Sequence, residues 1–219
     1  MTGTTTRLYG RVAFLSAISG FTLFIALHFL ERDLDPAWHM VSEYALGRHG
    51  WAMTSTFLLL SLSCVALAYS ILPFVKARRG NIGLALLVCA AAGLALASMF
   101  PTDPISVPPS EASRSAGIHA LSVMIGVPSL TTAALLISSS VAEQPIWSAK
   151  TLPVLGFAHL IWISLALTVT VVAIRMPDNG GFGPAVPVGW PNRLMFIAYF
   201  GWLGSMSWPL IRWQPEVSQ

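Results

Sequence analysis

The sequence is poor in charged residues. Of its 219 residues, 10% are Asp, Glu, Lys or Arg, whereas 55% are hydrophobic. A soluble domain carries about 25% charged residues, so this scarcity excludes an ordinary soluble domain. The twelve Lys and Arg residues are spread along the chain and form no cluster that could follow a phosphate backbone, so no nucleic-acid partner is expected. The composition is typical of a polytopic membrane protein.

Cysteine and the familiar catalytic motifs are also scarce. The two cysteines, Cys64 and Cys89, both fall inside apolar runs, where a thiol is usually a small packing residue. No H-E-x-x-H pair and no G-x-S-x-G elbow is present, so the sequence lacks the local signatures of zinc proteases and α/β-hydrolases.

Long apolar runs, in contrast, are abundant. A helix needs about 20 apolar residues to cross a hydrocarbon core about 30 Å thick. Six runs meet this length, at about 11–30, 52–75, 82–100, 117–139, 151–174 and 192–212. We expect the first to be a retained helix, because acidic residues follow it in place of a cleavage site for a signal peptide. The sequence therefore predicts an all-α bundle of six transmembrane helices, forming one integral membrane domain over residues 1–219.

The basic residues predict the orientation of the bundle. One set of alternate loops and tails contains Arg7, Arg11, Lys76, Arg78, Arg79, Lys150 and Arg212. The other set contains five arginines and seven acidic residues. Because cytoplasmic loops are enriched in Lys and Arg, both termini are expected in the cytoplasm of a multi-pass cell-membrane protein.

The densest chemistry lies in the first outer loop, DPAWHMVSEYALGRHG, residues 35–50. Asp35 followed by Pro36 is a helix-start signal, and Gly47 is a plausible stop. We expect a short interfacial helix from about 36 to 46. At helical spacing His39 and Glu43 would be neighbours on one face.

Further polar and aromatic residues are expected at the same outer face. Asp103 lies in the Pro-rich second outer loop, His119 and Ser122 share a stripe near the start of the fourth helix, and the Asp178-Asn179 turn lies in the third loop. One-sided clustering of this kind predicts an outward-facing polar and aromatic pocket. The candidate catalytic residues are Glu43, Asp103, His39 and His119, and the candidate substrate-binding residues are Trp38, Ser42, Tyr44, Trp51, Ser122, Trp190 and Arg193.

Four interpretations of this cluster remain open. No cofactor is required by the pattern, although His39, His119 and Asp103 could bind zinc. Ser42 or Ser122 could act as a nucleophile with a His base. Glu43 or Asp103, held in an aromatic pocket, could act as a general acid toward a lipid or isoprenoid olefin. Finally, the same residues could form a structural clasp that ties the loops together.

Three segments of the chain resemble a known family. They are HMVSEYALGRHGWAMT, the helix exit MFPTDP with a His at the head of the next helix, and the closing GWPNRLMFIAYFGWL. Together they are similar to the bacterial and archaeal membrane family catalogued as domain of unknown function 998. The resemblance implies a six-helix integral membrane protein and implies no particular activity. The matching positions are His39, Ser42, Glu43, Tyr44, Gly47, Asp103, His119 and Arg193. Asn192 stands where we would expect Gln in relatives.

The first functional hypothesis is a membrane-embedded enzyme or binding protein for a lipid-like or isoprenoid molecule, performing acid-initiated cyclisation or hydrolysis if it is an enzyme. One alternative is a small transporter or channel, for which His159, inside the fifth span, is the available titratable group. Another is a structural subunit, in which the Ala- and Gly-rich third helix could mediate oligomerisation.

Overall fold

A computed structural model describes residues 3–142, 144–176 and 180–214, and the described residues form helices and loops without strands. The six long helices are α1 (Gly3–Leu30), α2 (Gly50–Ile71), α3 (Arg78–Met99), α4 (Arg114–Val141), α5 (Thr151–Arg175) and α6 (Gly189–Ser207). Short 3₁₀ helices are η1 (Val41–Leu46), η2 (Leu72–Phe74), η3 (Pro109–Glu111), η4 (Pro145–Lys150) and η5 (Trp208–Arg212).

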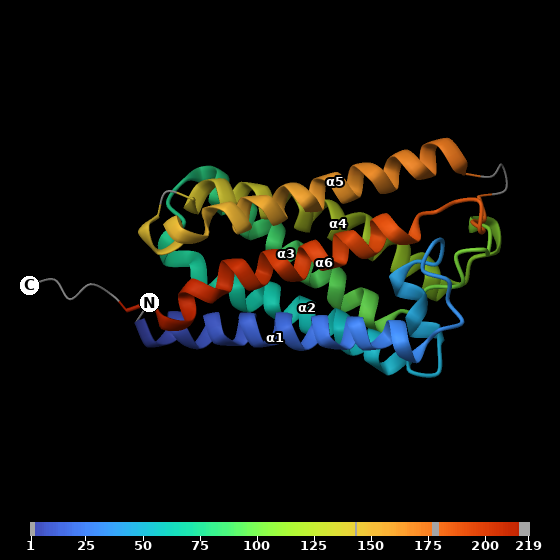
Figure 1. Ribbon diagram of the computed structural model, residues 1–219, viewed down its shortest axis with the longest axis horizontal. Coiled ribbons are helices and arrows are strands. Elements are labelled where there is room, and N and C mark those ends of the chain that lie inside the picture. Colours follow the sequence, from blue (N-terminus) through green and yellow to red (C-terminus); the bar gives the residue numbers. More distant parts are fainter. Residues whose placement is uncertain (1–2, 143, 177–179, 215–219) are drawn as a thin grey trace, which may run out of the picture.

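The six long helices confirm the predicted spans. Each is long and apolar enough to cross a membrane. The ribbon places both described chain ends at one end of the bundle, and the three loops 31–49, 100–113 and 180–188 gather at the opposite end (Figure 1). An even number of crossings requires this arrangement. That the terminal end faces the cytoplasm stays a prediction.

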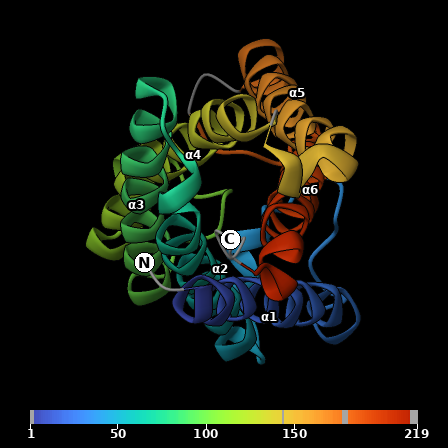
Figure 2. The same ribbon diagram turned by 90° about the vertical axis from the view of Figure 1, so that its left-hand side faces the viewer.

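The helices form a closed ring around the bundle axis. Consecutive helices contact each other from α1 to α6, and α6 returns to contact α1 and α2. Figure 2 shows this ring from the terminal end. Of the six, α5 is the least buried, because it packs mainly against α6 and less extensively against α4.

The terminal half of the ring is filled by large side chains. The Trp202 indole of α6 donates a 2.9 Å hydrogen bond to the Ser138 hydroxyl of α4, and the Trp147 indole of η4 donates one of 3.0 Å to the Met206 carbonyl. Both tryptophans are fully buried. The first bond joins α6 to α4 and the second joins η4 to α6, so together they close the terminal half of the bundle.

The small residues of α3 serve packing within the chain. A Cβ added to Gly93 would lie 2.8 Å from the Ser122 carbonyl oxygen and 2.9 Å from the Gly126 Cα, so α3 and α4 approach backbone to backbone. Gly83 is similarly close to Ile137 of α4. The part of α3 that carries these glycines is therefore covered by α4 of the same chain. Oligomerisation through α3 stays a prediction.

One expected element differs in form. In place of an α-helix over 36–46, residues 35–39 form turns and the 3₁₀ helix η1 begins at Val41. The Asp35 carboxylate does accept a hydrogen bond from the Ala37 N–H, as expected of a helix start. However, the Met40 N–H donates to the Glu43 carboxylate at 2.7 Å, and Met40 is in an extended conformation. Met40 therefore acts as the N-cap of a new helix, η1, which begins at Val41. Gly47 ends η1 as predicted.

Candidate functional site

The three loops at the far end of the bundle are bonded to one another through their backbones. The Phe182 N–H donates to the Ile105 carbonyl, and the Gly189 N–H donates to the Ala37 carbonyl, each at 3.0 Å. A Cβ on Gly189 would overlap the carbonyl oxygens of Pro36 and His39, so only glycine permits this approach. The loops therefore form one layer over the helix ends. Asp178 and Asn179 lie outside the described residues.

Glu43 is the central acceptor of this layer. Its side chain is 2% exposed, and its carboxylate accepts from the Met40 N–H at 2.7 Å, from the Ile105 N–H at 3.0 Å and from His39 Nδ1 at 3.0 Å. The predicted His39–Glu43 contact is thus present. Because Ile105 belongs to the second loop, the carboxylate ties two loops together.

Arg193 is the central donor. Only 3% exposed, its guanidinium donates to His28 Nε2 at 3.0 Å, to the Tyr44 hydroxyl at 3.0 Å and to three carbonyl oxygens, those of Pro36, His39 and Gly189. No carboxylate of a described residue lies within ion-pair distance of it. The three carbonyl dipoles and two further acceptors stabilise the buried cation, so Arg193 and Tyr44 are engaged in holding the loop layer to α1 and α6.

Asp103 is engaged in capping α4. Its carboxylate accepts from the Ser113 N–H at 2.6 Å and from the Ser113 hydroxyl at 2.9 Å, and Ser113 is the N-cap of α4. The Asp103 side chain fixes the start of the helix that carries His119 and Ser122. It does not line the cavity described below.

The expected aromatic wall is not assembled. Trp51 and Trp190 are 63% and 60% exposed, and Trp38 stacks on the His39 ring with centroids 3.7 Å apart. None of the three lines the cavity. Exposed tryptophans at helix ends are typical of the membrane–water interface, which explains their positions.

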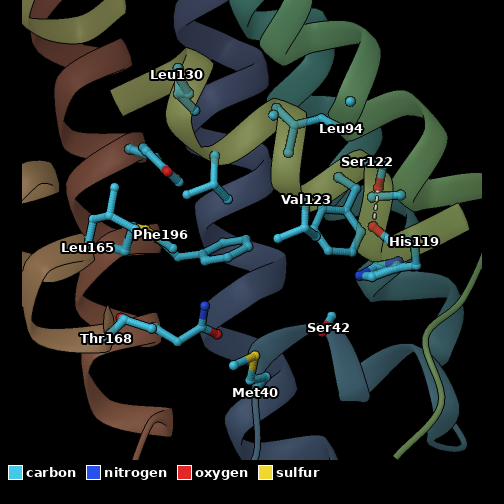
Figure 3. Close-up of a pocket in the computed structure, with 18 residues that line it drawn as sticks. Met40, Ser42, Leu94, His119, Ser122, Val123, Leu130, Leu165, Thr168 and Phe196 are labelled. Carbon is cyan, nitrogen blue, oxygen red and sulfur yellow. Dashed lines mark hydrogen bonds between the residues drawn. The ribbon is translucent and has the colours of Figure 1, made fainter. Parts of the chain in front are cut away.

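Beneath the loop layer lies a cavity of about 180 Å³ inside the ring of helices. Every long helix except α1 contributes to its wall, and η1 covers it from the loop side. In the close-up, Ser42, His119 and Ser122 lie on one side of the cavity and Leu165 and Thr168 on the other (Figure 3). Its lining residues are Met40, Ser42, Phe57, Gly93, Leu94, Ala97, His119, Ser122, Val123, Gly126, Val127, Leu130, Leu165, Thr168, Asn192, Met195, Phe196 and Tyr199.

His119 lines this cavity and contains a buried hydrogen-bond acceptor that has no partner among the described residues. Its Nδ1 lies 2.8 Å from the Phe100 carbonyl oxygen, which can only accept, so Nδ1 carries a hydrogen. In the neutral ring Nε2 is then an acceptor, and it is buried without any hydrogen-bond partner. The side chain is 4% exposed. An unpaired polar atom in such a place is costly, so a ligand that satisfies it would be favoured.

Two further polar groups line the loop side of the cavity. Asn192 Oδ1 accepts from the Val41 N–H at 2.9 Å, which fixes the amide orientation and leaves the Asn192 NH₂ group as the remaining donor. No hydrogen bond to that NH₂ group, or to the Ser42 hydroxyl, is formed by the described residues. The Ser122 hydroxyl, in contrast, donates to the backbone carbonyl of His119 at 2.6 Å.

The mouth of the cavity opens between α4 and α5. Val123 of α4 lines the cavity and is 40% exposed. Leu165 and Thr168, which line the opposite side, are partly exposed. Residues of both helices thus line the cavity and are partly exposed, from which we infer that the cavity opens along the seam between α4 and α5.

The described residues do not form the groupings that the zinc and serine-nucleophile interpretations require. His39 Nδ1 is bonded to Glu43, His119 Nδ1 to Phe100, and Asp103 to Ser113. Among the described residues no group of three or more His, Cys, Asp or Glu could hold a metal. Neither serine donates to a histidine ring in the described residues. Both interpretations stay predictions.

His159 lies apart from the cavity. It is on the exposed face of α5, and its Nδ1 is bonded to the Leu155 carbonyl at 2.7 Å. The transporter or channel alternative relied on this residue, and among the described residues the fold gives it no polar neighbour on another helix.

Sequence reasoning missed several cavity residues. Asn192 stood out only as a family variation, although a polar residue in the first turn of a membrane helix was a signal. No signal in the sequence marked four other lining residues, because their place in the cavity wall depends on which helix faces meet. They are Met40, Phe57, Thr168 and Tyr199.

Six helices long and apolar enough to span a membrane, arranged around a mainly apolar cavity, define a polytopic membrane protein. The chain belongs to the family described as protein of unknown function DUF998, whose model matches residues 12–209. This match confirms the resemblance seen in the sequence. No curated protein and no solved structure matches the chain.

Proposed function

We propose that this protein binds a membrane-dissolved, largely apolar molecule in the cavity, with the polar end of that molecule hydrogen-bonded to His119. The observation that carries the proposal is the buried, unpartnered Nε2 of His119 in an otherwise mainly apolar wall. Ligand sites typically combine such a wall with a few polar groups that orient the ligand.

The size of the cavity supports a ligand that is only partly enclosed. An apolar cavity of about 150 Å³ is sufficient for benzene, so the 180 Å³ here holds a small ring or a short branched chain. The remainder of a longer molecule would leave through the mouth beside Val123 and lie in the bilayer. A lipid or isoprenoid has this shape.

The carboxylic acids have a structural role in this proposal. Glu43 and Asp103 accept hydrogen bonds from backbone and side-chain donors and do not line the cavity. Acid-initiated cyclisation by either group therefore receives no support from the geometry. If the protein is an enzyme, His119 is the group placed to exchange a proton with the ligand.

The side of the membrane follows from charge. The loop layer above the cavity contains most of the acidic residues, and the terminal end contains the compact basic run 76–79. With the basic end in the cytoplasm, the cavity lies in the extracytoplasmic half of the membrane.

Photolabelling tests this proposal. The protein in lipid nanodiscs is irradiated with an isoprenoid probe that carries a diazirine, and the adducts are mapped by mass spectrometry. We expect adducts on cavity residues of α4 and α6. Val123→Phe should block the mouth and reduce them, while Val169→Phe, an exposed position of α5 outside the cavity, should leave them unchanged.

The contrary result is equally clear. If adducts were spread evenly over the lipid-facing residues of α1 and α5, and Val123→Phe did not change their distribution, the cavity would not be a binding site.

A further inference from the structure

We infer that the polar end of the ligand is a neutral hydroxyl group, so that the ligand class is a lipid alcohol. The inference rests on the proposed function and specifies the chemistry of its ligand. It follows from the hydrogen-bonding capacity of the three polar groups on the loop side of the cavity, His119, Asn192 and Ser42.

His119 requires a donor. Because the Phe100 carbonyl holds the hydrogen on Nδ1, the neutral ring offers only a lone pair at Nε2. An ether, an ester or a ketone has no hydrogen to donate and would leave this atom unpaired. An unpaired buried polar atom costs about 1–3 kcal/mol.

Asn192 requires an acceptor. Its carbonyl oxygen already accepts from the Val41 N–H, whereas neither of its own N–H groups has a partner among the described residues, so a group that can accept satisfies it best. Ser42 can donate or accept. A hydroxyl can donate to His119 and can also accept from a neighbouring donor, whereas an ether, an ester or a ketone can only accept.

The charge of the cavity excludes ionised head groups. None of the cavity-lining residues is Asp, Glu, Lys or Arg. The buried charged side chains of Arg193 and Glu43 are hydrogen-bonded within the loop layer and do not line the cavity. A phosphate, carboxylate or ammonium group would be buried without a counter-charge, at a cost of several kcal/mol.

Competition against the photoreactive probe tests the inference. Farnesol, farnesyl methyl ether, farnesoic acid and farnesylamine share one chain and differ at the head. We expect farnesol to reduce cavity labelling at a concentration about tenfold lower than the methyl ether, since one lost hydrogen bond is worth about 1.4 kcal/mol. The acid and the amine should compete more weakly still.

Two variants assign this preference to residues. His119→Asn retains an N–H for the Phe100 carbonyl and removes the acceptor at the Nε2 position, which the amide oxygen of the shorter Asn side chain does not reach, so farnesol and its methyl ether should compete equally. Asn192→Asp retains the acceptor for Val41 and adds a negative charge, so farnesylamine should become the strongest competitor. His159→Asn, which changes a histidine outside the cavity, should behave like the parent protein.

The outcomes separate the inference from the proposed function. Cavity labelling that the methyl ether prevents as well as farnesol does would overturn the hydroxyl inference and leave the cavity as a binding site. A farnesol preference that persists in His119→Asn would also overturn it. Absence of cavity labelling would refute both.

Discussion

The Nδ1 of His119 lies 2.8 Å from the carbonyl oxygen of Phe100, the residue that directly follows α3. This single bond joins α4 to the end of α3 and fixes the tautomer of the ring. The Phe57 ring packs against the imidazole in an edge arrangement at 6.0 Å. The orientation of the free Nε2 is therefore set by structure that is present before any ligand binds.

A stability measurement tests this bond. His119→Leu should lower the free energy of unfolding by about 1–2 kcal/mol, because the Phe100 carbonyl loses its donor. His119→Asn, which can still donate to that carbonyl, should remain close to the parent. Thermal unfolding in detergent measures both. If the two substitutions were equally destabilising, the bond to Phe100 would not be what holds the ring.

Glu43→Gln should destabilise the loop layer. The substitution replaces one acceptor oxygen by a donor that faces a backbone N–H, so at least one of the three hydrogen bonds is lost. Bonds to charged groups contribute about 1.5–3 kcal/mol, and we expect a loss of roughly 2 kcal/mol in chemical unfolding. Glu111→Gln, at an exposed position, is the control. A Glu43→Gln protein as stable as the control would show that the carboxylate is free for another role.

Arg193→Lys should be as harmful as a non-conservative change. A lysine ammonium has three donors on a flexible stem and cannot reach His28, Tyr44 and three carbonyls together. We expect a loss of about 2–4 kcal/mol in the free energy of unfolding, since a buried charge would remain incompletely paired. Arg175→Lys, at the exposed end of α5, should have little effect. Equal stability of the two variants would contradict the role of Arg193 as the central donor.

Alanine substitutions at two glycines that face each other, Gly93 and Gly126, should have different effects on stability. Gly93→Ala places a methyl group 2.8 Å from a backbone oxygen of α4 and should separate the two helices, with a loss of about 1–3 kcal/mol. Gly126→Ala meets Gly93 at 3.6 Å, an ordinary contact, and should be neutral or slightly stabilising. Thermal unfolding of both variants is the test. A destabilised Gly126→Ala with a neutral Gly93→Ala would mean that α3 and α4 pack differently.

The fold was largely predictable because membrane helices depend on apolar length. Each of the six expected ranges falls within a helical segment observed in the structure, apart from a residue or two at some ends, and the chain-end arrangement follows from their number. The helix ends extend beyond the apolar runs, as at Arg114, because backbone hydrogen bonding continues into the polar interface. The first outer loop was harder, since Glu43 competes locally for the backbone N–H of Met40.

The candidate site was predictable in part. The contact between His39 and Glu43 follows from helical spacing, and the inward position of His119 follows from its polarity in an apolar region. The sequence does not indicate that Asp103 faces Ser113, or that Asn192 faces the cavity, because these contacts join segments whose relative placement depends on packing. In the sequence, a structural clasp and a pocket competed for the same residues, but the structure separates them. Glu43, His39, Asp103 and Arg193 are bonded within the loop layer, and His119, Ser42 and Asn192 border the cavity beneath it.

The most direct test of the central claim is nitrogen-15 NMR of histidine-labelled protein in nanodiscs, with His119→Asn used to assign the His119 signals. We expect a neutral ring with hydrogen on Nδ1, and an Nε2 signal that shifts on addition of farnesol in the direction of an accepted hydrogen bond. An Nε2 that already carries hydrogen, or a signal unmoved by saturating farnesol, would contradict the account.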